Sequence, residues 1–172
     1  LAGLARFLYM SRFNPEDDNR KVVVSESEKI SVSDAPRPEE MAAVITRQVK
    51  DNSKIALLQD EVFFNWRYSN KRNKYIFYYY QKNNRTAAYL VIRLSKNGIR
   101  GYICDYAAEE SRFFEDILKF VIRKKYLDVI SIYNLNLPPD IAEILTRTGF
   151  RSKGILRRFE KKIIGEWPLM IR

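Results

Sequence analysis

The chain has 172 residues, and 46% of them are apolar, which suits a single domain with its own core and excludes a disordered chain. It contains no histidine, so nucleophilic schemes that need a histidine base and ordinary zinc enzymes are excluded. The formal net charge of +10 indicates a polyanionic partner, such as a phosphorylated cofactor, a nucleic acid or an acidic lipid, unless it reflects only a solvated basic surface.

The placement of the single cysteine and of the charges adds detail. Cys104 lies inside a run typical of a strand, so we expect a small core residue, no disulfide and a reducing, cytoplasmic location. No acidic residue lies between Val62 and Cys104. The basic residues of that acid-free stretch are Arg67, Lys71, Arg72, Lys74, Lys82, Arg85, Arg93, Lys96 and Arg100. No apolar run is long enough to span a bilayer, and we expect no metal site.

The chain begins with a segment that we interpret as helical. Residues 1–13 are apolar and basic, which predicts an amphipathic helix. This helix would belong to a connector over residues 1–20 that follows a preceding segment, with one domain over residues 21–172. A β-branched run at residues 21–27 predicts the first strand of that domain.

Two helices are predicted next. Ser33 or Asp34 ahead of Pro38 is typical of a helix start, and this helix should run to residue 50. The Asp/Asn/Ser cluster at residues 51–53 predicts the cap of a second helix that ends at residue 68. Apolar residues at helical spacing would form its buried face: Ile55, Leu58, Val62 and Trp66.

The following region reads as a three-stranded meander over residues 74–107. Strands at 74–82 and 86–95 are rich in aromatic and β-branched residues, and residues 82–85 between them read as a hairpin turn. Asn97-Gly98 is a second turn signal, and the strand after it should be antiparallel to the one before.

The rest of the chain alternates between helices and strands. We predict a helix at 111–126 with Ser111 as its cap, a buried strand at 128–134, a helix at 138–150 that stops at Gly149, and a last strand at 154–163. The fold class is therefore α+β. Its mixed sheet would combine the antiparallel meander with a parallel crossover from the strand ending at residue 107 to the strand at 128–134.

The order of these elements, with "LTRTGF" closing the last helix, resembles the GNAT acyltransferase superfamily. The stretch "LLQDEVFFNWRYSNKRNKYIFYYY" more narrowly resembles GNAT-like proteins encoded among bacterial surface-polysaccharide genes. The residues that match that pattern are Asp60, Phe63 or Phe64, Trp66, Arg67 and Tyr68.

The resemblance implies a site for acetyl-CoA or another acyl-CoA. Such a donor would lie where the parallel strands splay apart, with its pyrophosphate on the amides that begin the next helix. Family members usually carry Arg or Gln and two glycines at this place, but here Glu109 and Glu110 stand there. A plain strand-to-helix connection is the alternative interpretation. The donor-binding candidates are Ala107, Ala108, Ser111, Arg112 and Phe113.

The resemblance also implies direct acyl transfer to an amine, which needs a general base and a proton donor. Asp105 is the candidate base, although an Asp at a strand end also serves as a turn residue. Tyr106 and Tyr133 are candidate proton donors, or aromatic residues that fill the sheet. Asn134, at the end of the predicted strand 128–134, matches a polar residue that family members often carry at this place. The usual catalytic tyrosine is replaced by Leu145.

The acceptor side would be walled by the helix ending at residue 68. Arg67 is the favoured substrate-binding residue, while Trp66 is expected to anchor the core. Tyr78 and Tyr80 point the same way along their strand, so they form a candidate substrate ladder or part of the sheet packing.

Three functions remain open from the sequence. The first is transfer of an acyl group from acyl-CoA to an amine such as an amino sugar. The second is a catalytically degenerate binding module of a larger protein, with a second GNAT-like domain or a homodimer partner. The third is an aminoacyl-tRNA-dependent transferase of the same fold, favoured by the acid-free basic stretch.

Overall fold

The computed structural model describes residues 5–10, 21–25, 27–48, 59–134 and 137–154. The strands are β1 (Ala5–Met10), β2 (Lys21–Ser25), β3 (Glu28–Ser33), β4 (Tyr75–Lys82), β5 (Arg85–Leu94), β6 (Arg100–Ala108), β7 (Val129–Asn134) and β8 (Arg151–Gly154). The helices are α1 (Pro38–Gln48), α2 (Glu61–Tyr68), α3 (Ser111–Lys124) and α4 (Pro139–Arg147). No helix within these ranges has the length and apolar character to cross a membrane.

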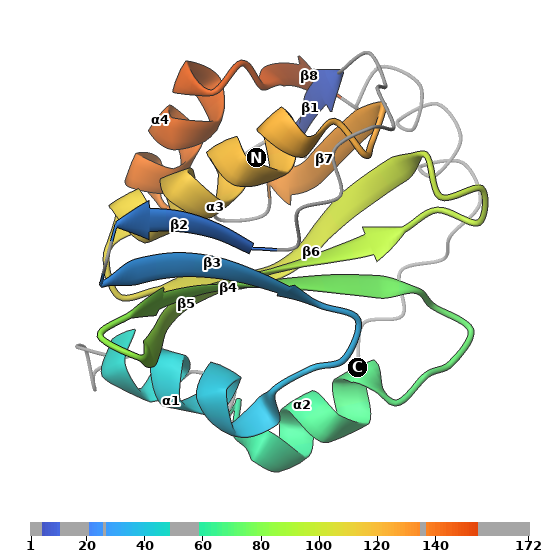
Figure 1. Cartoon of the computed structure of the whole chain (residues 1–172). Coiled ribbons are helices and arrows are strands. Elements are labelled where there is room, and N and C mark those ends of the chain that lie inside the picture. Colours follow the sequence, from blue (N-terminus) through green and yellow to red (C-terminus); the bar gives the residue numbers. More distant parts are fainter. Residues whose placement is uncertain (1–4, 11–20, 26, 49–58, 135–136, 155–172) are drawn as a thin grey trace, which may run out of the picture.

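The elements form three layers, in which one mixed sheet lies between two layers of helices (Figure 1). Helices α1 and α2 cover one face, and α3 and α4 cover the other. Each face has its own apolar cluster, because alternate residues of the central strands point to opposite sides. Phe77, Tyr79 and Tyr89 pack under α1 and α2, whereas Tyr78 and Tyr80 pack under α3.

The sheet has eight strands in the order β2-β3-β4-β5-β6-β7-β1-β8. Strands β6 and β7 pair in parallel, and the other neighbouring strands in this order pair antiparallel. The predicted meander and the predicted parallel crossover are both confirmed. The parallel ladder joins Arg100–Ile103 to Val129–Ile132 and then stops, although β6 continues to Ala108.

The hairpin between β4 and β5 has the predicted turn. Asn83 and Asn84 have φ values of 52° and 58°, so both occupy the left-handed region that a two-residue hairpin loop requires. Asparagine tolerates this region better than most residues. The predicted stop of α4 is also confirmed, since Gly149 follows the helix with a φ of 94°.

The predicted N-terminal helix is wrong for the residues that the structure describes there. Residues 5–10 form strand β1, which pairs antiparallel with β7 and with β8. A short apolar run fits a strand as well as a helix, and a helix of this length is marginal without packing, whereas the strand pairs along both of its edges with β7 and β8. A domain boundary near residue 20 stays a prediction.

Other boundaries are also corrected. Strand β3 is absent from the sequence prediction, whose first strand ends at residue 27 and whose next element starts at Ser33 or Asp34. Helix α2 has its cap at Asp60, whose carboxylate accepts the Phe63 N–H at 2.8 Å, while residues 49–58 lie outside the described residues. The last strand is β8 at residues 151–154, and the predicted strand at 154–163 lies almost wholly outside the described residues.

The faces of α2 are the reverse of the prediction. Phe64 is fully buried, whereas Val62 and Trp66 are each 73% exposed. Trp66 therefore does not anchor the core. The prediction places the start of this helix at residue 51, ten residues before the observed start of α2 at Glu61. The predicted apolar stripe therefore does not coincide with the face of α2 that packs on the sheet.

Gly101 is a close contact point between β6 and the α3 side of the sheet. A Cβ at this position would lie 2.5 Å from Leu127 Cδ1 and 2.7 Å from Ile92 Cγ2. We expect Gly101→Ala to lower the free energy of unfolding by about 1–3 kcal/mol, because a packed core must shift to admit the methyl group. Urea denaturation measures this change. The exposed neighbour Arg100 provides the control variant Arg100→Ala, and equal stability of the two variants would contradict the prediction.

Candidate functional site

A bulge in β6 determines how the candidate site is built. Val91 pairs with Asp105 and Ile92 pairs with Ile103, so Cys104 is an extra residue in β6. A bulge of this kind bends the strand and changes which way the next side chains point. Cys104 and Asp105 consequently both lie on the α2 side of the sheet. Cys104 is also the first residue of β6 beyond the ladder with β7.

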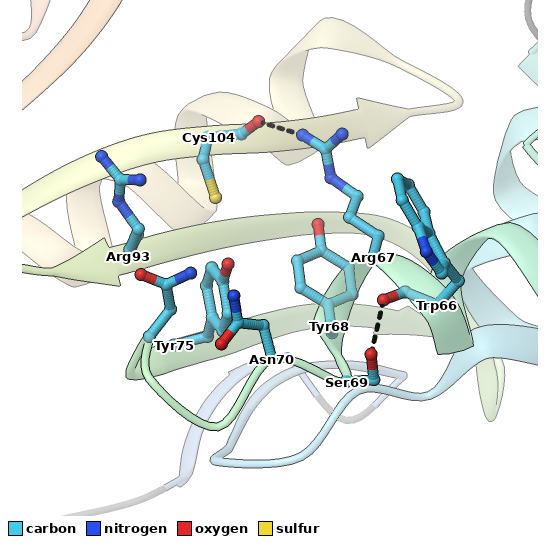
Figure 2. A pocket seen from close by; sticks show the side chains of 9 residues that line it. Trp66, Arg67, Tyr68, Ser69, Asn70, Tyr75, Arg93 and Cys104 are labelled. Atoms are coloured by element: carbon cyan, nitrogen blue, oxygen red, sulfur yellow. Dashed lines mark hydrogen bonds between the residues drawn. The ribbon is translucent and has the colours of Figure 1, made fainter.

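A cavity of about 440 Å³ lies between the end of α2 and strands β4, β5 and β6. Figure 2 shows this cavity, which we call the α2 pocket. The residues that line it are Trp66, Arg67, Tyr68, Ser69, Asn70, Asn73, Tyr75, Arg93 and Cys104. Its volume falls within the range of small-molecule sites.

Arg67 joins α2 to the bulge in β6. Its Nη2 donates to the Cys104 carbonyl oxygen at 3.0 Å, as the dashed line in Figure 2 marks, and its Nε lies 3.4 Å from Asp105 Oδ2. The position of Arg67 follows from the buried residues beside it, since Phe64 and Tyr68 pack α2 onto the sheet. Arg67 is the predicted substrate-binding residue, and the structure places it in the pocket wall.

Asp105 lies behind the pocket wall and does not line the pocket. Its side chain is 11% exposed. The Tyr68 hydroxyl donates to Oδ2 at 2.9 Å, and the Tyr89 hydroxyl lies 3.4 Å from Oδ1. Burial raises the pKa of Asp105 above its usual value, although Arg67 and the Tyr68 hydroxyl act in the opposite direction. Tyr68 binds Asp105 and does line the pocket, so a molecule in the pocket would contact the predicted base only through residues such as Tyr68.

The protons around Asp105 are held firmly. Burial and the Asp105 charge raise the pKa of Tyr68 and of Tyr89, so both hydroxyls stay protonated at neutral pH. Burial, with the nearby Asp105, raises the pKa of Cys104 to about 11. The Cys104 thiol is consequently a neutral part of the pocket wall and no nucleophile. No cluster of metal-binding side chains occurs in the part of the chain that the structure describes.

Tyr106 and Asn134 lie elsewhere. Tyr106 points to the opposite face of the sheet from Asp105 and packs on Phe114 with ring centroids 4.9 Å apart. Burial raises the pKa of Tyr106 to about 12. Asn134 ends β7, two residues beyond the ladder with β6, and its backbone pairs with β1. Tyr133 is exposed.

The acidic residues at the β6–α3 seam (residues 107–113) are paired with cations. The Glu109 carboxylate binds Arg47 and Arg85, and Arg85 Nη2 lies 2.8 Å from Glu109 Oε2. Arg112 binds Glu110 at 3.0 Å and Glu28 at 2.9 Å. Arg112, with Lys82, holds the pKa of Glu110 below its usual value. The cap of α3 is Glu110 instead of the predicted Ser111, and its side chain makes no capping hydrogen bond.

Several predicted site residues belong to the core. Ala107, Ala108 and Phe113 are buried, so only their backbone groups are available to a donor. Tyr78 packs on Phe120 and Tyr80 stacks on Phe113, both on the face opposite Arg67. The predicted tyrosine ladder is thus core packing, because strand alternation turned these rings toward α3.

The pocket also contains residues that the sequence analysis did not single out for a site. Arg93, Tyr75 and Asn70 come from β5, β4 and the segment after α2. The available signal was the acid-free stretch from Val62 to Cys104, which supplies every residue of the lining. Which of its basic residues face a cavity depends on strand pairing, and the charge pattern does not determine that.

Comparison with known proteins gives the fold. No protein-family model and no curated protein matches the chain. A probable N-acyltransferase of unknown function from Enterococcus faecalis matches with a TM-score of 0.60 at 13% identity, over 88% of this chain and 38% of that protein. A tandem GNAT protein of the clavulanic acid biosynthesis pathway matches with a TM-score of 0.55 at 11% identity, over 87% of this chain and 50% of that protein.

A third solved structure, a conserved protein of unknown function from Staphylococcus epidermidis, matches with a TM-score of 0.54 at 11% identity. The match covers 88% of this chain and 58% of that protein. The chain thus spans between about two fifths and three fifths of the proteins it resembles. At this level of identity the likeness establishes the fold alone, and the chain shares the mixed α+β fold of these structures, one of which is a tandem GNAT protein.

The Asp105 cluster is expected to hold α2 on the sheet. Asp105→Ala removes the acceptor of two tyrosine hydroxyls and the ion partner of Arg67. We expect the free energy of unfolding to fall by about 2–4 kcal/mol, since these buried groups lose their partner. Urea denaturation at neutral pH measures the loss. Asp34→Ala, which removes an exposed carboxylate, is the control, and a matching small effect at Asp105 would refute the role of the cluster.

The raised pKa of Asp105 has a consequence for stability against pH. The folded state holds the Asp105 proton more tightly than the unfolded state does, where the pKa is near 3.8. This contribution is present below the unfolded pKa and is lost as pH rises through the folded pKa. We expect the stability of the wild type relative to Asp105→Asn to decrease as the pH rises above the unfolded pKa of 3.8. A constant or widening difference in unfolding free energy would contradict it.

Proposed function

We propose that the chain is a GNAT-like N-acyltransferase domain that moves an acyl group from acyl-CoA to an amine. The observation that supports it is the position of the α2 pocket, whose wall includes Cys104, the residue at which β6 leaves its ladder with β7. Beyond this point the β6 backbone has no parallel partner among the described residues. An acceptor in the pocket and a donor beside β6 would therefore meet at the bulge.

The donor would be held mainly by backbone groups. The amides at the start of α3 favour an anion, and Arg112 is close enough to help to hold a diphosphate. Glu109 is compatible with a diphosphate at this place, because its carboxylate is paired with Arg47 and Arg85. Glu110 opposes it, because its side chain is exposed at the cap of α3. The amine would attack the thioester carbonyl carbon of acyl-CoA, and as the amide forms the C–S bond would break and CoA would leave as its thiolate.

The residues beside the pocket provide a path for the amine proton. Tyr68 lines the pocket and donates to Asp105 Oδ2 at 2.9 Å. The proton released on attack would pass to the Tyr68 oxygen while Tyr68 gives its own proton to Asp105, whose raised pKa favours acceptance. Arg67 keeps the carboxylate and the hydroxyl in place. Asp105 would then act through Tyr68, and Tyr106 and Asn134 remain candidates on the donor side.

A catalytically inactive GNAT-fold module is the second candidate. Leu145 stands where the family tyrosine is expected and is fully buried, so α4 offers no acid to a leaving thiolate at that position. The matched structures are longer than this chain, and one is described as a tandem GNAT protein. A module that pairs with a second GNAT-like domain would need the α2 pocket for binding and would need no catalytic residues of its own. An amino-sugar acceptor, a link to surface polysaccharide, a cytoplasmic location and an aminoacyl-tRNA donor stay predictions.

Acetyl-CoA titrations test the donor site and separate the two candidates. We expect Glu110→Gln to bind acetyl-CoA about three- to tenfold more tightly than the wild type, because it removes a carboxylate beside the diphosphate and releases Arg112. Isothermal titration calorimetry at low salt measures the affinities. The control variant is Glu39→Gln, at an exposed position of α1, and it should bind acetyl-CoA with the affinity of the wild type. Absence of binding by both the wild type and Glu110→Gln at millimolar acetyl-CoA would favour the inactive module.

A further inference from the structure

The charge of the α2 pocket is positive and only half balanced. Two guanidinium groups, those of Arg67 and Arg93, line it, and no carboxylate does. Asp105 balances Arg67 from behind the wall at 3.4 Å. Arg93 has no carboxylate within ion-pair distance among the residues that the structure describes. Its charge is therefore available to a molecule in the pocket.

Arg93 differs in this respect from the arginines that bind internal acids, whereas Arg72, Arg100 and Arg123 likewise have no ion pair among the described residues. Arg47 and Arg85 share Glu109, Arg112 binds two glutamates, and Arg147 binds Glu115 at 2.6 Å. The fold thus pairs many of its described arginines with internal acids. Among the described arginines without an acidic partner, Arg93 is the one that lines the α2 pocket, where a cation can serve a ligand.

Strand neighbours hold Arg93 in place. In the sheet it pairs with Tyr75 of β4 on one side and with Tyr102 of β6 on the other. Its guanidinium carbon lies 5.4 Å from the centre of the Tyr102 ring. Figure 2 shows Arg93 and Arg67 at opposite ends of the pocket with Cys104 between them. A planar cation held on a ring loses less freedom when it binds an anion.

The neutral groups of the pocket also suit an anion. The Asn70 side-chain oxygen already accepts the Arg72 N–H at 3.0 Å, which leaves its NH₂ group to donate. The Cys104 thiol keeps its proton, because its pKa is about 11, and adds no negative charge. The Asn70 NH₂ group and the Arg93 guanidinium are therefore donors in the pocket lining.

Aromatic surface at the rim indicates the rest of the ligand. Trp66 lines the pocket yet is 73% exposed, whereas the neighbouring Phe64 is fully buried. A large exposed indole at the edge of a cavity provides a face on which a ring can stack. Tyr75 adds a second ring on the β4 side.

We propose that the α2 pocket selects an acidic acceptor, in which a carboxylate or phosphate group binds Arg93 and a ring stacks on Trp66. This inference takes the pocket as the acceptor side and in that respect rests on the proposed function. The shared chemistry is an anion next to a flat apolar group. It assigns Arg93 as the residue that determines specificity, while Arg67 remains tied to Asp105.

The experiment compares an acid with its neutral analogue. Benzoate and benzamide have nearly the same shape, and phenyl phosphate replaces the carboxylate with a phosphate. NMR titrations of the full chain at constant ionic strength follow the amides of Ser69, Asn70 and Arg93. We expect benzoate or phenyl phosphate to bind about tenfold more tightly than benzamide, and the better of the two identifies the preferred anion.

Three variants locate the effect. Arg93→Gln should abolish the preference for the acid, while Arg100→Gln, an equal loss of charge outside the pocket, should keep it. Trp66→Ala should weaken the acid and the amide alike. Equal affinity for benzoate and benzamide in the wild type, retention of the preference by Arg93→Gln, or its loss in Arg100→Gln overturns the proposal. No acyl donor is used, so failure of acetyl-CoA binding leaves this result unaffected.

Discussion

The extra residue in β6 is the constraint on which the rest of the site depends. Cys104 has no partner of its own in the register with β5, and the strand bends there. The parallel ladder with β7 ends one residue earlier, at Ile103. The same residue turns Asp105 toward α2, where Arg67 and Tyr68 bind it. This irregularity in the backbone thus lies where the parallel ladder ends and builds the wall of a pocket on the α2 side.

The buried carboxylate of Asp105 connects this irregularity to α2. The helix is short, and of its residues Phe64 is the one buried most deeply, so packing alone gives it a small contact area. The ion pair and the tyrosine hydroxyls of the Asp105 cluster fix its end against the sheet. A buried charge requires such partners, since burial without them is costly. The cluster therefore sets the shape of the pocket, whatever molecule the pocket receives.

The two sides of the fold differ in how they treat charge. At the β6–α3 seam, Glu109 and Glu110 are matched with arginines from α1, β5 and α3. That pairing explains how acidic residues are tolerated beside the start of a helix that is expected to face a diphosphate. On the α2 side, Arg93 lines the pocket and has no ion pair with a carboxylate of the described residues. The contrast supports a domain whose acceptor pocket is better developed than its donor loop.

The sequence by itself determined the meander, the parallel crossover, the asparagine hairpin and the stop at Gly149, because each depends on local pattern and turn chemistry. It also predicted Arg67 as a substrate-binding residue, and Arg67 lies in the wall of the α2 pocket. The tertiary structure alone decided that residues 5–10 form a strand between β7 and β8, and that Trp66 is exposed. It likewise decided that the consecutive residues Cys104 and Asp105 lie on the same face of the sheet. Strand partners and a one-residue bulge come from contacts distant in the chain, and side-chain periodicity carries no record of them.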